Sequence, residues 1–206
     1  MNKIPYNLDE TLQIAQSIFS ATQAMTMAEQ SDCHFDPDSG SFTVPFLGDR
    51  YLVSYPSGNV NRLDNGDASS LTIAILLLHY LSRATGTALS GEWISYKELK
   101  GGRVYIDPFT KRAVVPFVKS FGSRPEQFAL AAAQFGGVKQ SHGDLAYSIR
   151  ALPRVPLLFI LWKGSEEFPP NGTILFDRHA NAYLHTEDYA ILAGMIVSSM
   201  NKFINR

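Results

Sequence analysis

The sequence predicts an α+β fold, with a mainly antiparallel sheet, helices packed on one face of it and a C-terminal helix. Three observations predict this class. Apolar residues recur at helical spacing near both ends of the chain, and short β-like runs separated by turn signals lie between them. A composition of 45% apolar and 18% charged residues supplies a core. For 206 residues we expect one domain, 1–206, with an N-terminal helix over about 7–29 and an α+β body over about 31–206.

The first elements are a helix and a hairpin. Asn7 has the residue type and the spacing to Glu10 of a helix cap, and apolar residues follow at helical spacing to about residue 29. Two β-like runs, 41–47 and 50–55, flank Gly48-Asp49, which is typical of a two-residue hairpin turn. We therefore expect a covering helix followed by an antiparallel pair of strands.

A second helix is expected between Asp67, as its cap, and Gly86. Its apolar residues lie nearly all round the helix, which indicates a central, buried element. Turn signals crowd the next segment. Ser95 and Glu98 have capping-box spacing, and Gly101-Gly102 is expected to stop the short helix they begin. Asp107-Pro108 is expected to open a further turn.

The C-terminal half is predicted to hold a helix, strands and the last helix. A helix begins at Ser123 and ends at Gly136-Gly137. The runs 143–152 and 155–162 are either two strands or one long strand bent at Pro153 and Pro156. A turn over Pro169–Gly172, a strand over 173–177 and a helix capped by Thr186 complete the expected elements.

Charge and cysteine content exclude several function classes. Eighteen basic and nineteen acidic residues give a net charge of −1, so no broad positive field steers the chain to nucleic acid. The apolar run 71–78 is too short to span a bilayer, and the N-terminus lacks the apolar region of a secretory signal. We expect a cytoplasmic protein with no nucleic-acid or membrane partner. Cys33, the one cysteine, cannot alone ligate an iron–sulfur cluster.

Four segments, taken in order, carry a resemblance to a known family: TVPFLGDRYLV, LLLHYLSRATGTALSGEWISYKELKGGRVYIDPF, LPRVPLLFILWKGSEEFPP and YLHTEDYAILAG. In their order and spacing the chain resembles the bacterial and archaeal domain of unknown function 3786, over roughly residues 7–197. The resemblance implies an association with anaerobes and, in some members, an attached four-cysteine iron–sulfur domain like that serving corrinoid proteins of one-carbon metabolism. This sequence has no such domain, so a redox association would apply through a partner or a bound cofactor.

One hypothesis from the residues is a site for a flat cofactor. His79 lies in the helix expected to be buried, where an imidazole could be the axial ligand of a haem or a corrinoid, or simply a core histidine hydrogen-bonded to a carbonyl or carboxylate. Aromatic side chains could line such a cavity or pack in the core. The candidate cofactor-binding residues are His79, Tyr80, Trp93, Tyr105, Trp162 and Phe168. No metal is assigned.

Two further groups of charged residues have a functional interpretation. Glu166, Glu167 and Asp177 could form an acid/base group if they lay close together, or they could be solvated loop residues. A loose basic stretch could meet the propionates of a tetrapyrrole or the acidic surface of a partner, or it could be an ordinary solvated surface. The stretch contains Arg103, Lys111, Arg112 and Lys119.

The sequence thus favours a binding role over an enzyme. We expect an accessory or binding protein of anaerobic one-carbon or redox metabolism, holding a corrinoid or haem-like cofactor or docking on an iron–sulfur or corrinoid protein partner. The alternative is a small hydrolase or lyase that uses the carboxylates of Glu166, Glu167 and Asp177.

Overall fold

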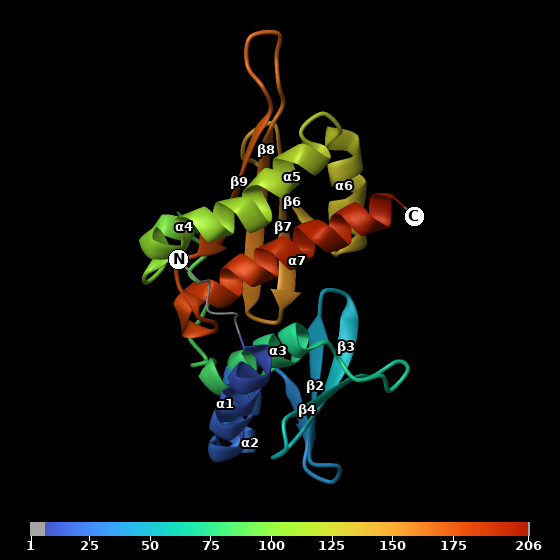
Figure 1. Ribbon diagram of the computed structural model, residues 1–206, viewed down its shortest axis with the longest axis vertical. Coiled ribbons are helices and arrows are strands. Elements are labelled where there is room, and N and C mark those ends of the chain that lie inside the picture. Colours follow the sequence, from blue (N-terminus) through green and yellow to red (C-terminus); the bar gives the residue numbers. More distant parts are fainter. Residues whose placement is uncertain (1–6, 206) are drawn as a thin grey trace. The chain divides into compact units, whose positions relative to one another are not determined.

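The structure is a computed structural model that describes residues 7–205, which form two compact units (Figure 1). Unit 1 contains the chain up to Thr87 together with Ala182–Leu184, and unit 2 contains Ala88–Asn181 and the chain from His185. The chain therefore crosses between the units three times, after residues 87, 181 and 184. Each unit has an antiparallel sheet, and the last element is a helix, so the predicted α+β class is confirmed.

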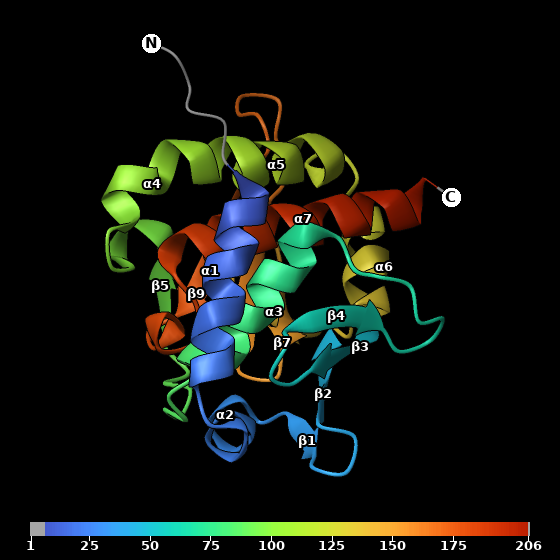
Figure 2. The same ribbon diagram turned by 60° about the horizontal axis from the view of Figure 1, so that its bottom comes forward.

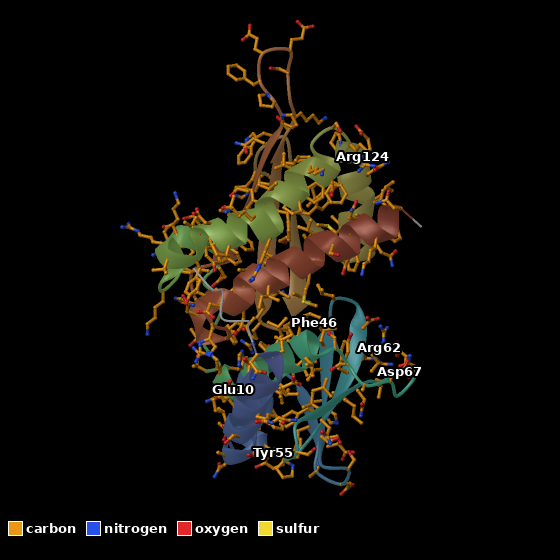
Figure 3. All side chains as sticks on the ribbon, in the orientation of Figure 1. Glu10, Phe46, Tyr55, Arg62, Asp67 and Arg124 are labelled. Carbon is orange, nitrogen blue, oxygen red and sulfur yellow. The ribbon has the colours of Figure 1, made fainter. Side chains whose placement is uncertain are left out.

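Unit 1 combines three helices with a four-stranded sheet in the order β1-β2-β3-β4. Its helices are α1 (Leu8–Ala21), α2 (Ala24–Ser31) and α3 (Leu71–Arg83), and its strands are β1 (His34–Asp36), β2 (Ser41–Phe46), β3 (Asp49–Ser54) and β4 (Asn59–Arg62). Edge-to-face contacts join Phe19 of α1 to Phe42 of β2 and to Tyr55. Figure 3 labels Arg62 at the end of β4, where it forms an ion pair of 2.9 Å with Asp49.

The single N-terminal helix expected over about 7–29 is wrong, because the chain leaves the helical conformation at Thr22 and Gln23. The cap at Asn7 is confirmed, since its side chain accepts a hydrogen bond from the backbone N–H of Glu10. The hydroxyl of Thr22 donates to the carbonyl of Ile18 at 2.9 Å, and its N–H donates to the carbonyl of Phe19. These bonds satisfy the last turn without prolonging the helix.

The hairpin between β2 and β3 is confirmed, with its turn one residue earlier than predicted. Leu47 and Gly48 both have positive φ, at 51° and 87°, as the tight hairpin turn that suits twisted strands requires. Helix α3 is mostly buried, as predicted, but its cap is Ser70 rather than Asp67. The carboxylate of Asp67 instead accepts a hydrogen bond from the side chain of Asn65 at 2.7 Å.

Unit 2 has a five-stranded antiparallel sheet in the order β5-β9-β8-β7-β6. The strands are β5 (Trp93–Ser95), β6 (Val138–Gln140), β7 (Leu145–Leu152), β8 (Val155–Trp162) and β9 (Asn171–Asp177). Strands β7 and β8 pair antiparallel across Pro153-Arg154, so the alternative of one long bent strand is wrong. Two prolines near a strand end indicated a bend, whereas Pro153 stands in the turn and only Pro156 lies within a strand.

One face of this sheet is covered by helices. A helical run crosses it as α4 (Gly102–Phe109), a π-helical turn (Thr110–Val114) and α5 (Val115–Phe121), with α6 (Pro125–Gln134) and α7 (Thr186–Ile204) beside it (Figures 1 and 2). Phe117 of α5 packs on Phe159 of β8, with ring centroids 5.5 Å apart. No helix in residues 7–205 is long and apolar enough to cross a membrane.

The helical run corrects the expectation that Asp107-Pro108 opens a turn. The short element that Ser95 begins is a 3-10 turn, Tyr96–Glu98, which ends before Gly101-Gly102, and α4 begins at Gly102. Pro108 lies inside α4, and Pro116 lies at the start of α5. Proline lacks the N–H that would bond the carbonyl four residues earlier, so Pro116 leaves the carbonyl of Arg112 without its α-helical donor. A π-turn shifts the bonding to five residues at this point. The carbonyl oxygen of Arg112 faces α7, where a Cβ on Gly194 would lie 3.1 Å from it.

The remaining helix ends differ from the prediction by one or two residues. Helix α6 begins at Pro125 rather than at Ser123. The cap of α7 is His185, whose N–H donates to the carboxylate of Asp188, rather than Thr186. The hydroxyl of Thr186 instead donates to the carbonyl of Lys100 at 2.7 Å, which ties α7 to the turn before α4.

Candidate functional site

Two of the six predicted cofactor-binding residues, His79 and Tyr80, lie in α3 of unit 1. His79 is half-buried. Tyr80 is buried, and its hydroxyl donates to the carbonyl of Ser31 at 2.5 Å. The centroid of its ring also lies 6.1 Å from that of Tyr183, a residue of the 182–184 segment that belongs to unit 1. The hydroxyl of Tyr183 donates to the carbonyl of Thr87. Tyr80 is therefore a structural residue of the unit 1 core.

The two tryptophans lie in unit 2, on the same face of the sheet but at opposite ends of it. Trp93 pairs with Asp177 and Trp162 pairs with Asn171, six residues away along β9. An even separation places both on the face without helices, and six residues correspond to about 20 Å. Trp93 packs against a buried cluster of Ala146, Leu158 and Ile160. The two indole rings therefore do not wall a common pocket.

Tyr105 and Phe168 are placed differently again. Tyr105, on α4, lies close enough to Tyr96 for its charge to contribute to the raised pKa of that phenol, after burial and the charge of Glu187. Tyr96 stacks on Phe109, on the helix-covered face and thus opposite to Trp93. Phe168 lies in the loop between β8 and β9. Within unit 2, the predicted aromatic residues are not brought together.

The carboxylates of the enzyme alternative are also separated. Asp177 is buried, and its two oxygens accept hydrogen bonds of 2.9 to 3.1 Å from the backbone N–H groups of Ser90, Gly91 and His179. Glu166 and Glu167 are exposed beyond the other end of β9, about 20 Å or more away along the strand. Asp177 thus holds the segment before β5 to the end of β9, and no acid/base group forms with the two glutamates.

The helical run of unit 2 instead gathers the basic stretch onto one face. Its buried positions recur every four residues, at Phe109, Ala113, Phe117 and Phe121. In an α-helix with 3.6 residues per turn, positions four residues apart drift gradually around the helix, so this stripe would rotate away from the sheet. The wider π-turn takes up the extra residue and keeps the stripe facing the sheet. The opposite side then stays exposed along the whole run. Its exposed residues are Arg103, Val104, Asp107, Pro108, Lys111, Arg112, Val115 and Lys119, and we call this surface the basic helix face.

The basic helix face combines positive charge with exposed apolar side chains. It carries four cations and one carboxylate, that of Asp107. Within residues 7–205, none of the four cations has an ion pair or a side-chain hydrogen bond. Val104 is 77% exposed and Val115 is 53% exposed. Unpaired cations around apolar side chains are typical of a surface that meets an acidic protein.

A second exposed feature of unit 2 is the tip of the β8–β9 hairpin, residues 163–170, which projects past the helices (Figure 1). Phe168 at this hairpin tip is 69% exposed, and Glu166 and Glu167 stand exposed beside it. Side chains of the tip point away from unit 2 in Figure 3. Near its apex the tip therefore presents an apolar group next to two negative charges, and the exposed cation of Lys163 lies at its base.

The comparisons with known proteins identify the family. Residues 24–199 match the family described as Domain of unknown function (DUF3786). The chain belongs to this family. No curated protein and no solved structure matches it. Membership of DUF3786 confirms the resemblance that the four sequence segments carry, and it brings no activity with it.

Sequence reasoning named every cation of the basic helix face but not the surface they form. The signal that could have found it is the four-residue recurrence from Phe109 to Phe121, which continues through Pro116. Asp107-Pro108 instead indicated a turn, so the sequence predicted a loose basic stretch and not cations along one helical run.

Proposed function

We propose that the chain is an accessory protein that docks on an acidic partner protein through the basic helix face of unit 2. The observation that carries the proposal is the exposure of four unpaired cations around Val104 and Val115 on one rigid helical run. Complementary charge speeds the encounter and selects the partner, while the exposed valines supply apolar contact. From the family resemblance, the partner is an iron–sulfur or corrinoid protein of anaerobic redox or one-carbon metabolism.

Docking is better supported than direct binding of a cofactor or catalysis. The predicted aromatic residues of unit 2 lie on different faces or at different ends of its sheet. Asp177 is fully engaged by backbone N–H groups, far from Glu166 and Glu167. Binding of haem or a corrinoid by this chain alone stays a prediction, and the visible spectrum tests it. A shifted Soret or corrin band on mixing would support it.

The docking proposal is tested by charge reversal. The tagged chain captures its partner from an extract of the native organism, prepared without oxygen, and the captured protein is identified and its absorption spectrum recorded. Lys111→Glu/Arg112→Glu is expected to abolish capture. Lys139→Glu/Arg150→Glu is the matched control, since it makes the same change of charge at exposed residues of β6 and β7.

Capture should weaken as salt rises, because ion pairs at a surface are screened over about 8 Å at physiological ionic strength. An acidic captured protein with an iron–sulfur or corrinoid spectrum would support the whole proposal. Equal capture by both double variants would refute docking through the basic helix face. A captured protein without a chromophore would refute the identity of the partner.

A further inference from the structure

The hairpin tip is a preformed element. The N–H of Ser165 donates to the carbonyl of Phe168 at 2.8 Å, and the Ser165 hydroxyl accepts from the N–H groups of Glu167 and Phe168. Pro170 anchors its base, because a Cβ on Gly122 would lie 2.8 Å from the Pro170 ring and one on Gly164 would lie 2.9 Å from it. A tip with fixed geometry loses little conformational entropy when it binds.

Three exposed side chains of the hairpin tip, those of Glu166, Glu167 and Phe168, are not engaged by other side chains of the described part of the chain. Glu166 and Glu167 form no ion pair there. Phe168 makes no aromatic contact with the rest of residues 7–205 and leaves most of its surface in water. Exposed aromatic residues on projecting loops are typical anchors of protein interfaces, where they fill a pocket and contribute much of the affinity.

The surface that complements the hairpin tip lies on the same unit. The tip offers two carboxylates and an apolar ring near its apex, with the cation of Lys163 at its base, and the basic helix face offers Lys111, Arg112 and Lys119 around Val115. The tip projects past the helices on a stem fixed by the pairing of β8 with β9 (Figure 1). It therefore does not fold back on its own basic helix face, and a second molecule must supply the contact.

We propose that the hairpin tip of one copy docks on the basic helix face of a second copy. Each copy has one tip and one face, so a two-fold dimer makes the same contact twice and leaves neither surface open. The dimer covers the basic helix face, which is also the surface of the proposed function. If that function holds, self-association and docking on an acidic partner exclude one another, and this consequence rests on the proposed function. The dimer is thus the resting form, from which an acidic partner releases the basic helix face.

The test is a charge swap on the purified chain alone. Its mass in solution is measured by light scattering across a range of protein concentrations and salt. The wild-type chain is expected to dimerise, with a dissociation constant that rises at least tenfold between low and high salt. Glu166→Lys/Glu167→Lys and Lys111→Glu/Arg112→Glu should each be monomeric, because like charges then meet at both contacts.

Mixing the two double variants should restore a 1:1 dimer. At one contact the lysine-bearing tip of the first variant meets the glutamate-bearing face of the second, and at the other contact the native tip of the second meets the native face of the first. Phe168→Ser should weaken the wild-type dimer at least tenfold, and circular dichroism of each variant checks that it is folded. A wild-type chain that stays monomeric at high concentration, or folded variants that do not associate when mixed, would overturn the proposal. Neither outcome bears on capture of an acidic partner, so the two proposals fail separately.

Discussion

Gly102, the first residue of α4, is the position at which one added methyl group should do most harm to unit 2. A Cβ there would overlap the carbonyl oxygen of Tyr96 and lie 2.9 Å from its carbonyl carbon. Gly102→Ala must therefore push away the turn at Tyr96–Glu98. Tyr96 cannot follow freely, because its hydroxyl donates to the carbonyl of Thr186 at 2.8 Å and its ring stacks on Phe109 at 4.1 Å.

The cost of Gly102→Ala follows from these contacts. Loss of the Tyr96 hydrogen bond costs about 1 kcal/mol, and loss of the stacked ring pair costs about 1 kcal/mol more. Disturbing the capping box of Ser95 and Glu98 adds about 1 kcal/mol. We expect a total of about 3 kcal/mol in the free energy of unfolding.

The neighbouring glycine is the matched control. A Cβ on Gly101 meets nothing within 4 Å, and its φ of 78° makes alanine cost about 1 kcal/mol through backbone strain alone. Urea denaturation followed by circular dichroism measures both variants. If Gly102→Ala costs no more than Gly101→Ala, the contact between the Ser95–Glu98 turn and the start of α4 is not as described.

Three further predictions concern the cores and the buried thiol. Leu78→Asp should abolish the cooperative unfolding of unit 1, because a buried, unpaired carboxylate costs several kcal/mol and a domain is stabilised by roughly 5 to 15 kcal/mol. Leu78→Met is the control and should fold. A soluble Asp variant with a sharp unfolding transition would contradict this. Burial raises the pKa of the Cys33 thiol from 9.0 to about 11, so the free energy of unfolding should fall by about 2 kcal/mol between pH 9 and pH 11 as the unfolded thiol ionises first. Denaturation of Cys33→Ala over the same pH range is the comparison, and an equal fall in both proteins would remove the thiol as its cause. Trp93→Ala should lower the free energy of unfolding by about 3 kcal/mol, because Trp93 packs on the cluster of Ala146, Leu158 and Ile160, and it should leave docking unchanged. An unchanged thermal midpoint with loss of binding would instead indicate that Trp93 lines a binding pocket.

Local signals predicted the elements that depend on neighbours in sequence. The hairpin of β2 and β3, the cap at Asn7 and the capping box of Ser95 and Glu98 need only a few adjacent residues, and the structure contains all three. The capping box nevertheless encloses a single 3-10 turn and not a longer helix. A sequence pattern thus found the bond but not the length of the element that it begins.

Features that depend on tertiary contacts could not be predicted from the sequence. Pro108 and Pro116 end a helix by local rules, whereas the packing of Phe109, Phe117 and Phe121 stabilises a run that continues through both. Asp177 appeared as one of three acidic groups, and only the chain path shows that backbone N–H groups of Ser90 and Gly91 engage it.

The arrangement of the predicted cofactor-binding residues in unit 2 could not be predicted for the same reason, because it depends on contacts between residues that are distant in sequence. Aromatic residue types suggested a cavity, but sheet register and helix placement decide which rings share a face, and they separate Trp93 from Trp162 and Tyr105. Arg103 and Lys119 are sixteen residues apart and share a surface only because the helical run is unbroken.

The most direct test of docking is a photo-crosslink from the basic helix face in living cells of the native organism. A benzophenone amino acid at Val115 contacts whatever covers the face, and the same probe at Val138, which is exposed on β6, is the control. The docking function predicts that Val115 crosslinks to an acidic iron–sulfur or corrinoid protein and Val138 does not. Identical crosslinks from both positions, or none from Val115, would contradict it.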